Sequence, residues 1–147
     1  MTKLPHDALV FVGDGRKALF LRNAGDEAIP DLRTEQVFAE DNPQTHEQGT
    51  DRPGRGVESG GTHRRSSIEQ TDWHHLEEHR FAERVAKALE DVVRTRHVPA
   101  LLVAAPPKTL ADLRKAFHAD VKAKIVAEVD KDLTKHPVSE IETHLLG

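Results

Sequence analysis

The sequence predicts a single α/β domain, spanning residues 1–147, in which helices cover a mixed five-stranded sheet. Short continuous apolar runs are typical of buried strands, and longer segments carry apolar residues at helical spacing. The two kinds of segment alternate in the second part of the chain. With 147 residues, of which 37% are hydrophobic and 31% charged, the chain can bury one core beneath a well-charged surface.

The first part of the chain predicts three strands. The apolar runs 8–12 and 17–21 flank a Gly-Asp-Gly segment at 13–15, which indicates a tight hairpin. Such residues tolerate the positive φ that primed hairpin turns require. Segment 31–40 supplies the third strand.

The second part predicts three helices and two strands. A long helix begins with Ser67 or Thr71 as its N-cap and ends at Arg96, with one apolar face. The remaining elements are a strand at 100–104, a helix at 108–120, a strand at 125–129 and a helix at 137–146. Because β-α-β crossovers join parallel strands, the order β-β-β-(long loop)-α-β-α-β-α predicts the strand order of the ribonuclease-H-like group.

Composition also excludes several classes of protein. A net charge of −4 and a pI near 6.2 argue against a uniformly basic surface, although a local basic patch is compatible with them. The chain has no cysteine, which excludes disulfides and thiolate zinc sites. The N-terminal apolar run is too short for a signal peptide, and no stretch approaches the roughly 20 apolar residues of a membrane span. We therefore expect a cytoplasmic protein without a membrane partner.

A Gly/Arg-rich stretch at about 40–70 separates the two parts and is the main candidate binding site. Arginine forks match phosphate geometry, and glycine lets a loop approach a nucleic-acid backbone closely. A disordered surface loop explains the same composition equally well. The candidate nucleic-acid-binding residues are Gln48, Gly49, Arg52, Gly54, Arg55, Gly60, Gly61, His63, Arg64 and Arg65.

Two further patterns indicate weaker candidate sites. An H-x-x-E-H pattern places His75 and His79 beside Glu78, as in inverted zinc proteases. Both histidines fall toward the solvent side of the predicted helix and no third ligand is indicated, so we expect no metal, no cofactor and no catalytic residue. Lys108 and Thr109 begin a helix directly after a strand, where free amides and an ammonium group could hold an anion. A plain structural junction explains that position more simply.

Five segments of the chain resemble the bacterial host attachment protein family, the proteins required for attachment to host cells. These segments are LPHDALVFVGDGRKALFLRN, DNPQTHEQGTDRPGR, TDWHHLEEHRFA, LLVAAPPKTLADLRKAFH and KDLTKHPVSEIE. Such proteins are similar to bacterial relatives of the archaeal and eukaryotic peptide-chain release factors, whose central domain has a ribonuclease-H-like fold. The resemblance implies that stretch 40–70 takes the place of the release factors' Gly-Gly-Gln loop, which enters the peptidyl-transferase centre.

The chain departs from that loop at one position, because Gly60 and Gly61 precede Thr62 instead of glutamine. The resemblance therefore implies binding without peptide release. We expect a non-catalytic module that binds the ribosome, rRNA or tRNA through its Gly/Arg loop. An adhesion or interaction protein in attachment to host cells is the first alternative, and a hydrolase or metalloenzyme is the second. The oligomeric state is left open.

Overall fold

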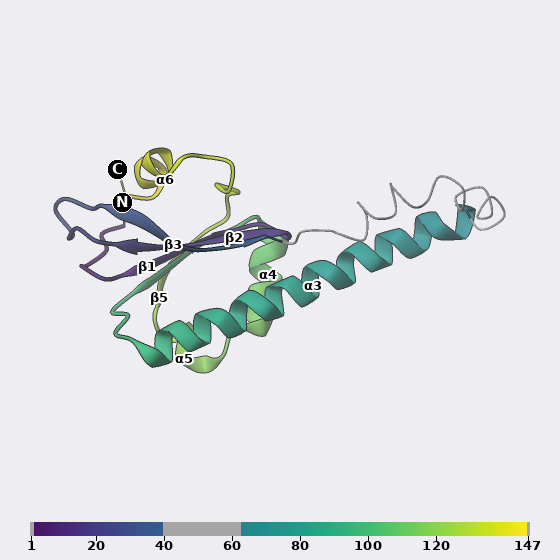
Figure 1. Cartoon of the computed structure of the whole chain (residues 1–147), viewed down its shortest axis with the longest axis horizontal. Coiled ribbons are helices and arrows are strands. Elements are labelled where there is room, and N and C mark those ends of the chain that lie inside the picture. The colour runs from purple at the N-terminus through teal and green to yellow at the C-terminus, as the bar shows by residue number, and fades with distance from the viewer. Residues whose placement is uncertain (1, 40–62, 147) are drawn as a thin grey trace.

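A computed structural model describes residues 2–39 and 63–146, with side chains in the second range described from Leu76 onward (Figure 1). Five strands lie within these residues: β1 (Leu9–Gly13), β2 (Lys17–Asn23), β3 (Leu32–Ala39), β4 (Leu101–Ala104) and β5 (Ile125–Val129). The helices are α3 (His63–Thr95), α4 (Pro107–Ala116), α5 (Ala119–Lys122) and α6 (Val138–Leu146). No helix among the described residues is long and apolar enough to cross a bilayer.

The strands form one mixed sheet in the order β3-β2-β1-β4-β5. β1 pairs with β2 and β2 with β3 in antiparallel fashion, whereas β1 with β4 and β4 with β5 are parallel. The predicted mixed α/β sheet of five strands is therefore confirmed. β1 and β4 are central and buried, which explains why they read as continuous apolar runs, whereas β5 is a partly exposed edge strand.

The sheet buries both of its faces, because successive side chains of a strand point to opposite sides. Leu9 and Phe11 of β1 face the side covered by α3, α4 and α5, while Val10 and Val12 face the side covered by α6. We call these the α3 face and the α6 face, and Figure 1 shows the two groups of helices on opposite sides of the sheet. Leu4, from the segment before β1, completes the core of the α6 face.

The apolar stripe predicted for the long helix is confirmed. Phe81, Val85 and Leu89 are almost fully buried on the α3 face, with Ala88 and Val92 packed partly buried beside them. α3 begins at His63, however, so the predicted start at Ser67 or Thr71 is wrong. Residues 63–70 contain neither glycine nor proline, and an N-cap residue contributes only about 1 kcal/mol, too little to stop a helix-compatible segment.

The single helix predicted at 108–120 is also wrong, since α4 and α5 are separate. α4 ends at Ala116, and Phe117 takes an extended backbone with ψ 133°. His118 then serves as the N-cap of α5, where its Nδ1 accepts a hydrogen bond from the Asp120 amide at 3.1 Å. Phe117 remains buried on the α3 face, so the break keeps the predicted inward residue in place.

The hairpin between β1 and β2 is confirmed, but the predicted reason for it is not. None of the described glycines has a positive φ. Instead, the Asp14 carboxylate accepts hydrogen bonds from the amides of Arg16 and Lys17, both at 2.7 Å. A side-chain turn of this kind closes the hairpin without a left-handed residue.

A buried amide fixes the opposite end of the sheet. Asn23, the last residue of β2, is 0% exposed. Its Oδ1 accepts from the amides of Gly25 at 3.0 Å and Asp31 at 2.9 Å, and its Nδ2 donates to the Leu4 carbonyl at 3.0 Å. One side chain thereby holds the connection between β2 and β3 against the N-terminal segment.

A chain of ion pairs attaches the carboxyl end of α3 to the sheet. Arg22 of β2 bonds Glu35 at 2.9 Å and Asp7 at 3.0 Å, and Glu35 also accepts from Arg96, just beyond α3. These hydrogen bonds, first that of Glu35 and then that of Asp7, raise the pKa of the Arg22 guanidinium. Glu35 lies where the pairing of β2 with β3 shifts register.

Candidate site at the carboxyl ends of the parallel strands

The carboxyl ends of β1 and β4 lie side by side, because Val12 pairs with Ala104 in a parallel register. Beyond β1 the chain turns back into β2 on one side, and beyond β4 it enters α4 before it returns to β5 on the other. Open α/β sheets bind ligands at such a divergence point. We call the carboxyl ends of β1 and β4 the carboxyl edge of the sheet. It is the candidate site to which the predicted residues Lys108 and Thr109 belong.

Glu78 of α3 reaches into this edge and contacts two other elements. Its Oε1 lies 3.8 Å from the Nζ of Lys108 in α4. Its carboxyl group also lies against Gly15 in the β1–β2 turn, where a Cβ added to the glycine would come within 2.8 Å of Glu78 Oε2. Glycine at this position allows the close approach of Glu78, and it has no positive φ. We refer to the three residues as the Glu78 contact.

The start of α4 has two features that favour a negative charge: the positive end of the helix dipole carries no side-chain cap, and Lys108 supplies an ammonium group. Pro106 occupies its N-cap position without a side-chain capping bond, and Pro107 is the first helical residue. Lys108 is exposed and Thr109 is partly buried. Glu78 already brings a carboxylate to this position, so an external anion would have to compete with it for Lys108. The anion site at Lys108 and Thr109 stays a prediction.

A buried hydroxyl connects the segment after β5 to the same edge. Thr134 is 4% exposed, and its Oγ1 lies 2.6 Å from Asp132 Oδ1 and 3.1 Å from Asp14 Oδ2. A hydroxyl has one hydrogen, so it can donate to only one of the two carboxylates at a time. The contact between Asp14 and Thr134 spans 120 positions of sequence, and no local pattern indicates it.

The two described members of the H-x-x-E-H pattern point to different partners. Glu78 contacts Lys108, whereas His79 Nε2 lies 3.6 Å from Glu83 Oε2 on the same helix. The side chain of His75 lies outside the described ones. Among the side chains that are described, no group of three or more histidine, aspartate or glutamate residues is placed to hold a metal ion.

Most of the predicted Gly/Arg loop lies outside the described residues. His63, Arg64 and Arg65 are included as backbone only, and they form the first turn of α3. The other candidate residues, which are not described, are Gln48, Gly49, Arg52, Gly54, Arg55, Gly60 and Gly61. The predicted loop at 40–70 therefore overlaps α3 over residues 63–70.

The amino-terminal half of α3 extends beyond the sheet (Figure 1). Phe81 is the first described side chain of this helix that belongs to the buried core, and Leu76 is 42% exposed. At 1.5 Å per residue, the half that precedes Phe81 is about 25 Å long. We call this part of α3 the arm.

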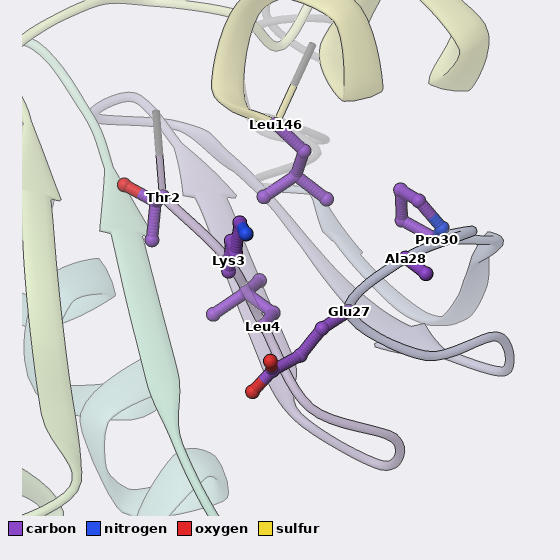
Figure 2. A pocket seen from close by; sticks show the side chains of 7 residues that line it. All are labelled: Thr2, Lys3, Leu4, Glu27, Ala28, Pro30 and Leu146. Carbon is purple, nitrogen blue, oxygen red and sulfur yellow. The ribbon is translucent and has the colours of Figure 1, made fainter.

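A pocket of about 270 Å³ lies at the other end of the sheet, away from the Glu78 contact (Figure 2). Leu4 and Leu146 are among its apolar walls, and Lys3 and Glu27 supply charges. Figure 2 shows Leu146 directed from the end of α6 toward the N-terminal segment. Sequence reasoning missed this pocket, since its lining comes from three separate parts of the chain.

Comparison with known proteins identifies the family. The model of the family described as "Protein required for attachment to host cells" matches residues 9–145. No curated protein matches the sequence. The matched range begins at the first residue of β1 and ends within α6, so it takes in the whole sheet and all the helices around it. The chain therefore belongs to the family of proteins required for attachment to host cells.

Proposed function

We propose that this chain is a non-catalytic module of the cytoplasm that binds RNA or the ribosome through its Gly/Arg stretch, and that its part in attachment to host cells is indirect. The observation that carries the proposal is the combination of Arg52, Arg55, Arg64 and Arg65 with glycines at the amino end of a projecting helix. Guanidinium groups bind phosphate in bidentate fashion, and this contact does not depend on the base sequence of the nucleic acid.

The proposal includes a relationship to the central domain of the peptide-chain release factors. The strand order β3-β2-β1-β4-β5 supports it, because ribonuclease-H-like domains share that order. The position of the Gly/Arg stretch between β3 and the long helix supports it as well. Fold similarity alone does not assign a function, so the binding assay below carries the test.

The proposal assigns binding and not peptide release. In the release factors a glutamine follows two glycines, whereas Thr62 follows Gly60 and Gly61 here. A glutamine side chain carries an amide with donors and an acceptor, and a threonine hydroxyl is shorter and has a single donor. Phosphate contacts by the neighbouring arginines do not need that amide.

Co-sedimentation with ribosomes and gel-shift with tRNA test the proposal. We expect the wild-type chain to bind both, with an affinity that falls steeply as salt rises, because neutralised phosphates release counterions. The variant R52A/R55A/R64A/R65A should lose binding by at least tenfold and show a smaller salt slope. Wild-type chain that never co-sediments with ribosomes and never shifts tRNA would refute the proposal.

A matched control separates the Gly/Arg stretch from net charge. The variant K115A/K122A/K131A/K135A removes the same positive charge from four exposed lysines outside the stretch. Its affinity should stay within twofold of wild type. An equal loss of affinity in both quadruple variants would show that binding depends on the overall positive charge and not on the Gly/Arg stretch.

The family description favours a second candidate function, direct adhesion at the cell surface. It predicts that antibody labels the chain on intact cells, and that a deletion strain attaches poorly to host cells. Complementation with R52A/R55A/R64A/R65A distinguishes the candidates. If this variant cannot bind RNA but still restores attachment to host cells, direct adhesion is supported and our proposal is contradicted.

A further inference from the structure

Three titratable side chains line one side of α6 at intervals of four residues. His136 lies in the turn before α6, Glu140 in its first turn and His144 in its last. His136 Nδ1 lies 2.8 Å from Glu140 Oε1. The rings of His136 and His144 have centroids 5.1 Å apart and planes at 65°. The side chains of His136 and Glu140 are 36% and 57% exposed, so solvent ions can reach them.

We propose that His136 and His144 form a surface binding site for a transition-metal ion of the zinc, copper or nickel class. Imidazole nitrogen suits these ions, while magnesium and calcium prefer oxygen ligands. A metal–nitrogen bond of about 2.1 Å puts each ring centroid about 3 Å from the metal, and a tetrahedral angle then separates the two centroids by about 5 Å. The observed 5.1 Å agrees with this separation.

Glu140 positions the first of the two ligands. A carboxylate that accepts a hydrogen bond from Nδ1–H fixes the imidazole tautomer and leaves the Nε2 lone pair free for a metal. Metal-binding histidines commonly have such a carboxylate partner. Two imidazoles are half of a tetrahedral set, so water would have to supply the other ligands, because no group of three or more such side chains is placed to hold a metal among the described ones.

The same contacts also have a purely structural explanation. His136 and Glu140 could serve as a helix start, and a histidine in the last turn interacts favourably with the helix dipole. An edge-to-face pair of rings is itself weakly attractive. That explanation requires no metal. It therefore predicts that the wild-type chain binds no zinc and shows no thermal shift in the experiment that follows.

The site would connect the two ends of α6. This helix covers one face of the sheet, and its Leu146 lines the pocket of Figure 2. A metal bound to the folded chain and not to the unfolded one raises the unfolding temperature in proportion to the logarithm of its concentration above Kd. The proposal is independent of nucleic-acid binding, because both proposed ligands lie outside the Gly/Arg stretch in the sequence.

Calorimetric titration of the tag-free chain with ZnCl₂, and melting curves with and without the metal, test the site. We expect one zinc per chain and an unfolding temperature raised by a few degrees. H136Q and H144Q should each bind at least tenfold more weakly and lose the thermal shift. E140Q should weaken binding by about tenfold without abolishing it.

H97A is the matched control, since His97 is an exposed histidine that follows α3 and lies outside the cluster. It should bind zinc as the wild type does. Circular dichroism of each metal-free variant confirms that α6 has not been lost. A wild-type chain that binds no zinc, or a loss in H97A equal to that in H144Q, would overturn the proposal.

Discussion

Gly15 and Glu78 form a close approach that no local sequence pattern indicates. Gly-Asp-Gly predicted a hairpin correctly, but it did not indicate that Gly15 also leaves room for the carboxylate of a residue more than sixty positions away. The same limit applies to Asp14 and Thr134. Hairpin chemistry is local and therefore predictable, whereas these contacts depend on how β1, α3 and the segment after β5 come together.

Gly15→Ala should destabilise the chain by about 1 kcal/mol, because the new Cβ displaces Glu78 from Lys108. In a Glu78→Ala background the same change should be neutral or stabilise by about 0.4–1 kcal/mol, since alanine reduces the entropy of the unfolded chain. Urea denaturation of the four proteins in a double-mutant cycle measures the coupling. Equal costs in both backgrounds would show that Glu78 does not occupy this space.

Asn23→Ala should cost about 2–4 kcal/mol of folding free energy. The change leaves the amides of Gly25 and Asp31 and the carbonyl of Leu4 without their buried partner. Asn23→Asp keeps the acceptor for the two amides but removes the donor to Leu4, so its stability should fall between those of the wild type and Asn23→Ala. Thermal unfolding gives the order, and a loss below about 0.5 kcal/mol for Asn23→Ala would contradict the role assigned to this amide.

At the scale of the element, apolar periodicity predicted most of the fold. The stripe on α3 and the runs of β1 and β4 follow from burial, which dominates the energetics and repeats along the chain. Boundaries were predicted less well. The start of α3 and the break between α4 and α5 depend on single caps and on Phe117, whose contributions are an order of magnitude smaller than those of a whole buried face.

The two halves of α3 should respond differently to the same substitution. Leu89→Ala removes a 0% exposed side chain from the core of the α3 face and should cost about 2–5 kcal/mol. Leu76→Ala, in the arm, should stay within about 0.5 kcal/mol of wild type because that side chain is 42% exposed. Urea denaturation compares them directly. A large loss for Leu76→Ala would mean that the arm is covered in the free protein.

At the scale of the molecule, the sheet separates the candidate sites from one another. The Glu78 contact lies at the carboxyl ends of the parallel strands, while the pocket lined by Leu4 and Leu146 lies at the other end. α6 and its histidine pair cover the face opposite to α3. The proposals for RNA and for zinc use different residues of the sequence, so they fail or succeed separately, and a variant that tests one leaves the residues of the other intact.

The continuity of α3 from the arm into the core has a mechanical consequence. α3 is one continuous helix, so the arm can tilt as a rigid body about the point where Phe81 enters the core. Because the arm is about 25 Å long, a tilt of about 5° at Phe81 moves the amino end of α3 by about 2 Å. Glu78 lies in the arm, three residues before Phe81, and contacts Lys108 and Gly15. A tilt of the arm would therefore also displace the Glu78 contact, which joins the arm to the carboxyl edge of the sheet.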